Sequence, residues 1–131
     1  MEIPHPQLLQ CRLLFDGGYY EKASQILTED FYNALTHRKH RLQYLYRKGR
    51  VLHALKSYAE ALHYYSLTIT AGRDEPYYYA CSAALQCGII HETLGSEGAA
   101  ARYYQICLQI HPETYATGLH QKARMGLNRM E

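Results

Sequence analysis

Apolar residues recur every three to four positions along most of this chain, in segments that end at turn residues. The first segment follows Pro4 and Pro6 and stops at Gly17-Gly18, which predicts a helix with proline before it and glycine after it. A second predicted helix runs on from about Tyr19. Its apolar positions are Tyr20, Ala23, Ile26, Leu27 and Phe31.

Two further helical segments occupy the middle of the chain. One runs from about Arg38 to Leu55. The next opens at Ser57-Tyr58-Ala59-Glu60, which has the form of a capping box, and stops at Gly72. Asp74-Glu75-Pro76 then predicts the start of another helix, because acidic residues suit a helix N-terminus and proline suits its first turn.

The stretch from Cys81 to Pro112 predicts two helices joined by a tight turn. The first stops at Leu94-Gly95, and the second starts after Ser96. Small residues at Gly88 and Ala100 are expected to let the two helix axes approach closely. One more amphipathic helix is predicted after this pair, at about residues 114–130.

These segments form an internal repeat. Cys11, Gly49, Gly88 and Gly126 recur at intervals of 38, 39 and 38 residues (11 to 49, 49 to 88 and 88 to 126). The pattern resembles the tetratricopeptide repeat (TPR), a helix–turn–helix unit of about 34 residues. The match is strong in the second and third repeats and moderate in the first; in the second repeat the signature positions hold Gly49, Tyr58, Ala61 and Tyr65. The additional residues are expected in the loops between hairpins or in an extra helical turn.

The resemblance implies an all-α fold, a right-handed TPR-like α-solenoid of seven helices in a single domain over residues 1–131. Three helix–turn–helix hairpins are expected at about residues 4–36, 38–72 and 76–111, with a capping helix at about 114–130. It also implies a protein–protein interaction module that binds a peptide or a partner helix in its concave groove. Two alternatives stay open: a structural or regulatory spacer within a larger multidomain protein, and a self-association module that forms homo-oligomers.

In TPR arrays the first helix of each hairpin lines the concave surface. The residues that the resemblance places there are Arg12, Phe15, Tyr46, Arg50, His53, Leu85, Ile89 and Glu92, with His120, Ala123 and Leu127 closing the row. Arg12 and Arg50 could hold a carboxylate or a phosphorylated side chain through paired hydrogen bonds. Chaperone-binding TPRs use a Lys and Asn clamp that this sequence lacks, so a chaperone tail is not expected.

Composition and charge narrow the classes of partner. The 131 residues carry a formal net charge of +2, which is too small to indicate nucleic acid binding. The basic cluster His37-Arg38-Lys39-His40-Arg41 is expected to be a solvated helix start, with a phosphate or acidic-partner patch as the alternative. No apolar run is long enough to span a membrane, and the N-terminus lacks the pattern of a signal peptide. A cytoplasmic chain is therefore expected, provided that Met1 is the native start.

Catalysis, metals and cofactors are not expected. The four cysteines lack a C-x-x-C pair and fall on helix-packing positions, which favours buried free thiols. Cys87 and His91 have a spacing that could supply two zinc ligands, and this remains the minor alternative. His91-Glu92 is not a zinc protease motif, because position 95 holds glycine in place of the second histidine.

Overall fold

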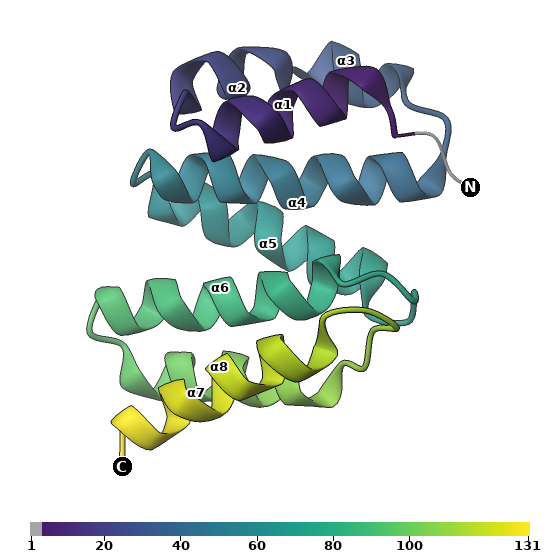
Figure 1. Ribbon diagram of the computed structural model, residues 1–131. Coiled ribbons are helices and arrows are strands. Elements are labelled where there is room, and N and C mark those ends of the chain that lie inside the picture. Colours follow the sequence, from purple (N-terminus) through teal and green to yellow (C-terminus); the bar gives the residue numbers. More distant parts are fainter. Residues whose placement is uncertain (1–3) are drawn as a thin grey trace. The chain divides into compact units, whose positions relative to one another are not determined.

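A computed structural model describes residues 4–131, and this part of the chain is all α-helical, with eight helices and no strand (Figure 1). The all-α prediction is confirmed. The helices are α1 (Pro6–Asp16), α2 (Tyr20–Ile26), α3 (Glu29–Ala34), α4 (Arg38–Ala54), α5 (Tyr58–Gly72), α6 (Tyr79–Thr93), α7 (Glu97–Gln109) and α8 (Ala116–Arg129). Among the described residues, no helix has the length and apolar character needed to cross a membrane. The prediction that the N-terminus is not a signal peptide rests partly on residues 1–3, which lie outside the described part.

The chain divides into two compact units, described separately below. The N-terminal unit extends to Tyr64 and holds α1 to α4 with the start of α5. The C-terminal unit begins at Tyr65 and holds the rest of α5 with α6, α7 and α8. Within it, α6 and α7 form an extensively packed pair, and α8 packs against both. The single domain over residues 1–131 stays a prediction.

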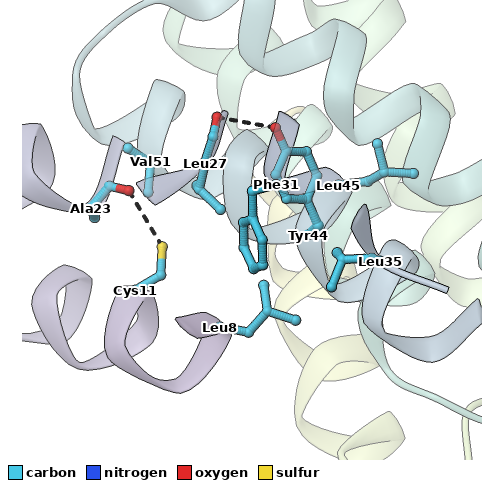
Figure 2. Packing of buried hydrophobic residues seen from close by; sticks show 9 residues of the cluster. All are labelled: Leu8, Cys11, Ala23, Leu27, Phe31, Leu35, Tyr44, Leu45 and Val51. Carbon is cyan, nitrogen blue, oxygen red and sulfur yellow. Dashed lines mark hydrogen bonds between the residues drawn. The ribbon is translucent and has the colours of Figure 1, made fainter. Parts of the chain in front are cut away.

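A cluster of buried side chains holds the N-terminal unit together (Figure 2). Leu8 and Cys11 of α1 and Ala23 of α2 have no exposed surface, and the Cys11 thiol lies 3.7 Å from the Ala23 carbonyl oxygen. Because a thiol and a methyl group are small, α1 and α2 can pack closely at this point. The cluster consists of Leu8, Cys11, Ala23, Leu27, Phe31, Leu35, Tyr44, Leu45 and Val51.

The helix predicted from about Tyr19 through Phe31 is in fact two helices, so the expected total of seven helices is wrong. The backbone leaves the helical region at Leu27 (φ −88°, ψ 64°). The Tyr44 hydroxyl lies 3.0 Å from the Leu27 carbonyl oxygen (Figure 2) and 2.9 Å from that of Thr28, and Lys48 Nζ donates a further hydrogen bond of 3.0 Å to the Leu27 carbonyl. Side chains of α4 therefore supply the donors that the interrupted helix lacks. The Thr28 side chain then caps α3 by accepting a hydrogen bond of 3.1 Å from the Phe31 N–H.

Three helices, α1, α4 and α6, end in the same hydrogen-bonded turn. A residue with positive φ follows each helix: Gly18 (84°), Lys56 (64°) and Gly95 (79°). In all three turns, the N–H of the residue with positive φ donates to the carbonyl oxygen three residues earlier. The N–H of the residue after it donates to the carbonyl oxygen five residues earlier. The donor–acceptor distances are 2.8 to 3.1 Å. This is the Schellman motif. The predicted stops at Gly17-Gly18 and Leu94-Gly95 are confirmed, and the turn recurs with the period of the sequence repeat.

The start of α6 differs from the sequence prediction. Asp74-Glu75-Pro76 do not open the helix, which begins at Tyr79. The Pro76 carbonyl instead accepts a hydrogen bond of 2.9 Å from the Glu113 N–H. The segment before α6 therefore pairs through the backbone with the segment after α7. This bond favours an irregular loop before α6, and not an extra helical turn, as the place of the additional residues.

Candidate functional site in the groove between α6 and α8

A groove runs between α6 and α8 in the C-terminal unit. It contains two adjoining hollows of about 200 and 220 Å³ that share Ile89, Tyr104 and Arg129 as lining residues. The first hollow is also lined by Leu85, Lys122 and Met125, and the second by Glu92 and Thr93. The groove therefore combines apolar side chains with charged ones, as ligand sites commonly do.

Tyr104 of α7 lies beneath this groove and is fully buried. A Cβ atom added at Gly88 of α6 would lie 2.5 Å from Tyr104 Cδ1, and one added at Gly126 of α8 would lie 2.5 Å from Tyr104 Cε2. The two glycines thus leave space for opposite edges of the same ring. Gly88, which was expected to let two helix axes approach closely, here makes room for the Tyr104 ring. The ring is in contact with α6 and α8 and so joins three helices.

The hydroxyl of Tyr104 connects the buried ring to the charged part of the groove. It donates a hydrogen bond of 2.6 Å to Glu92 Oε1. Arg129 binds the same carboxylate through both oxygens, at 2.8 Å to Oε1 and 3.2 Å to Oε2. The hydrogen bonds from Arg129 and then from Tyr104 lower the pKa of Glu92. At neutral pH the Glu92 carboxylate is consequently ionised, and Arg129 balances its charge.

Two side chains of α8, Lys122 and Met125, add a positive charge and an apolar surface to the groove. Lys122 is exposed and forms no ion pair within residues 4–131, so its charge is unbalanced there. Met125 is 54% exposed, so its thioether adds apolar surface to the groove. A positive charge beside an exposed thioether suits a ligand with both acidic and apolar groups.

The structure brings together the three site residues predicted on α6. Leu85, Ile89 and Glu92 all line the groove. The residues expected to close the row on α8 lie elsewhere: Ala123 is fully buried, and a ring nitrogen of His120 lies 2.7 Å from the Ile110 carbonyl oxygen.

Sequence reasoning missed the part of α8 that does line the groove. Lys122, Met125 and Arg129 are three and four positions apart, which places them on one face of a helix. This spacing is visible in the sequence. It could have indicated the groove once Gly126 was assigned to the buried side of α8.

Among the predicted site residues of the N-terminal unit, Arg50 lies against Phe15, which is half-buried. The Arg50 guanidinium carbon lies 5.1 Å from the centre of the Phe15 ring, and that of Arg47 lies 5.5 Å from it. Arg12 is exposed on α1, where its Nε lies 3.8 Å from Asp16 Oδ2. The fold thus joins Phe15 with Arg50, while Arg12 is next to an acid of its own helix.

Tyr46 and His53 complete the predicted set on α4. Tyr46 is only 5% exposed, and its ring lies 5.5 Å from the Arg47 guanidinium carbon. His53 is half-buried, and burial together with the nearby Arg50 lowers its pKa. Arg47 was not predicted: it is 6% exposed, and its buried Nε has no hydrogen-bond partner.

All four cysteines are free and buried. Burial raises the pKa of Cys11 to about 11 and that of Cys87 to about 12, so both are protonated at neutral pH. His91 stacks on Tyr103, with ring centres 5.4 Å apart. Across residues 4–131, no three His, Cys, Asp or Glu side chains are grouped so that they could hold a metal ion. The Cys87 and His91 pair thus lacks a third ligand in this part of the chain.

Comparisons of the chain with protein-family models, with curated proteins and with solved structures found no match. The function must therefore be argued from the geometry of the groove.

Proposed function

We propose that this chain is a TPR-type helical repeat protein that binds a peptide segment of a protein partner in the groove between α6 and α8. The observation that carries the proposal is the pair of adjoining hollows along this groove, with Ile89 between them. The recurrence of one Schellman turn after α1, α4 and α6 supports the repeat assignment, because such units share their turn geometry.

The chemistry of the groove favours a peptide that carries an apolar side chain next to an acidic one. Leu85, Ile89 and Met125 offer apolar contact in the first hollow. The negative charge of Glu92 is already balanced by Arg129, whereas Lys122 has no such partner in the described residues. An acidic residue of the ligand would therefore meet net positive charge beside Lys122, in the first hollow.

Peptide selection followed by binding measurements tests this proposal. Peptides would be selected from a random phage-displayed library, synthesised with a fluorophore and titrated by fluorescence polarisation. We expect Lys122→Glu and Met125→Glu to weaken binding about tenfold or more, since each removes a contact and adds repulsion. Arg124→Glu is the matched control, because Arg124 is exposed on the same helix but does not line the groove.

The proposal fails if the selected peptides bind all three variants as tightly as the unchanged chain. Circular dichroism of each variant would confirm that the overall helix content and the melting temperature are retained, so that lost binding is not lost structure. The same peptides would also be titrated against Arg50→Glu and Arg12→Glu, two changes in the N-terminal unit. Both variants should bind the peptides as tightly as the unchanged chain, because neither residue lines the groove.

A further inference from the structure

Two of the buried cysteines lie against each other. Cys81 is in the first turn of α6 and Cys107 is in the last turn of α7, and their sulfur atoms are 3.6 Å apart. Both residues have no exposed surface. The Cys81 sulfur also lies 3.5 Å from the Cys107 carbonyl oxygen, and the Cys107 sulfur lies 3.8 Å from the Leu119 carbonyl oxygen.

We propose that Cys81 and Cys107 are a modification site, at which hydrogen peroxide converts the two thiols into a reversible intrachain disulfide. A disulfide requires the sulfur atoms to approach to about 2.05 Å, which small rotations of two side chains already in contact can supply. The bond would join the end of the α6–α7 hairpin that lies opposite the turn at Gly95. The hairpin would then be closed at both ends.

The reaction balances with one equivalent of peroxide. The Cys81 thiolate attacks one peroxide oxygen and breaks the O–O bond, which gives a sulfenic acid and, after protonation of the leaving oxygen, water. The Cys107 sulfur then attacks the Cys81 sulfur, displaces the hydroxyl group as a second water and loses its proton. Two thiols are oxidised by two electrons, and the peroxide is reduced to water. A dithiol reverses the reaction by thiol–disulfide exchange.

The surroundings favour different roles for the two sulfurs. The hydrogen bond with Cys107 lowers the pKa of Cys81, and the same bond raises the pKa of Cys107. This asymmetry favours Cys81 as the sulfur that reacts first with peroxide and Cys107 as the one that resolves the sulfenic acid, while the 3.6 Å contact lets either sulfur take either part. Because both sulfurs are buried, the reaction waits for local opening of these helix ends and is slow.

The other two cysteines provide an internal control. Neither Cys11 nor Cys87 has a sulfur contact with another cysteine in the described residues, and the thiol of Cys11 points to the Ala23 carbonyl. They share burial and the same side chain with the proposed pair but lack its geometry. A Cys11→Ala/Cys87→Ala variant therefore keeps the site, and Cys81→Ala removes it.

The experiment treats the purified chain with hydrogen peroxide and counts free thiols after unfolding. The unchanged chain should lose two of its four thiols, and peptide mass spectrometry should find Cys81 linked to Cys107. The Cys11→Ala/Cys87→Ala variant should lose both of its thiols and melt at a higher temperature than its reduced form, because the bond restricts the unfolded chain. Cys81→Ala should form no intrachain disulfide.

A different cysteine pairing would overturn the proposal, as would four surviving thiols or conversion of Cys81 to sulfinic acid without a linked peptide. A linked pair that leaves the melting temperature unchanged would also overturn the predicted closure of the hairpin. If the double alanine variant does not fold, the peptide map of the unchanged chain decides the question by itself.

Discussion

Replacing Gly88 or Gly126 by alanine tests the packing around Tyr104. A Cβ atom at Gly88 would lie 2.5 Å from Cδ1 and 2.8 Å from Cζ of the tyrosine, and one at Gly126 would lie 2.5 Å from Cε2 and 2.6 Å from Cζ. Real Cβ atoms do not approach so closely, so something must move. The ring cannot retreat from one methyl group without meeting the other helix, and the hydrogen bond to Glu92 restrains its outer end.

The expected cost follows from two opposing effects. Overpacking a well-filled core costs about 1–3 kcal/mol, and a ring confined on both edges belongs near the upper limit. Alanine regains about 1 kcal/mol because it is a better helix former than glycine. The net loss is about 2 kcal/mol for either substitution. For a chain of this length we take about 4 °C per kcal/mol, which lowers the melting temperature by about 8 °C.

Urea denaturation followed by circular dichroism measures this loss. Gly118→Ala is the matched control, because it lies on α8 like Gly126 but has no atom within 4 Å of an added Cβ. Its midpoint should equal or slightly exceed that of the unchanged chain. In the Gly126→Ala background, Tyr104→Leu should cost about 1–2 kcal/mol less than it does alone, since the smaller side chain relieves the crowding.

Unchanged midpoints for both Gly88→Ala and Gly126→Ala would refute the confinement of the Tyr104 ring. Equal losses for Gly118→Ala and Gly126→Ala would attribute the effect to the backbone of α8 instead. If the losses of stability from Gly126→Ala and Tyr104→Leu simply add in the double variant, the methyl group of the new alanine and the Tyr104 ring do not meet.

Three further predictions concern other parts of the chain. Lys56→Gly should raise the free energy of unfolding by about 1 kcal/mol, because positive φ is costly for any residue with a Cβ; a lower urea midpoint would contradict the turn geometry. Thr28→Ala should cost about 1 kcal/mol and speed hydrogen exchange at the Phe31 N–H, whereas Thr28→Ser should retain the cap; equal effects of the two changes would contradict it. The lowered pKa of Glu92 means that its contribution to stability is present above pH 4.5, its usual value, and is lost as the pH falls through the lower folded value. Glu92→Gln should flatten the stability curve on this acidic side, and an unaltered curve in urea titrations at a series of pH values would argue against the bond to Arg129.

The sequence predicts most helices because local signals and packing agree there. Gly18 and Gly95 adopt the positive φ that glycine tolerates, so these stops are visible as residues. Lys56 occupies the equivalent turn without glycine, and there the turn is indicated by the capping box that starts at Ser57 and by the repeat period.

The break between α2 and α3 was missed because apolar periodicity continues across it. Leu27 and Phe31 are both buried and four positions apart, as in one uninterrupted helix. The contrary signal is Thr28-Glu29-Asp30, a capping residue followed by two acids. The competing interaction comes from the Tyr44 hydroxyl on α4, which bonds to the carbonyls at the break and which no local pattern reveals.

The groove was half predictable for a similar reason. Its α6 side follows from the repeat pattern, which selects Leu85, Ile89 and Glu92. Its α8 side depends on the rotation of α8 about its own axis. The contact of Gly126 with the Tyr104 ring fixes this rotation and directs Lys122, Met125 and Arg129 toward the groove.

Tyr104 therefore links the stability of the C-terminal unit to the shape of its groove. Its ring sets how closely α6 and α8 can approach it, and its hydroxyl holds Glu92, which in turn holds Arg129. A change that moves the ring is expected to alter both the stability of the fold and the shape of the groove, and with it the binding proposed there, because Tyr104 lines both hollows. A change at Lys122 alters only the charge of the groove, since this exposed side chain takes no part in the ring contact. Variants that lose binding without losing stability are accordingly expected at Lys122 and Met125, and not at Gly88 or Gly126.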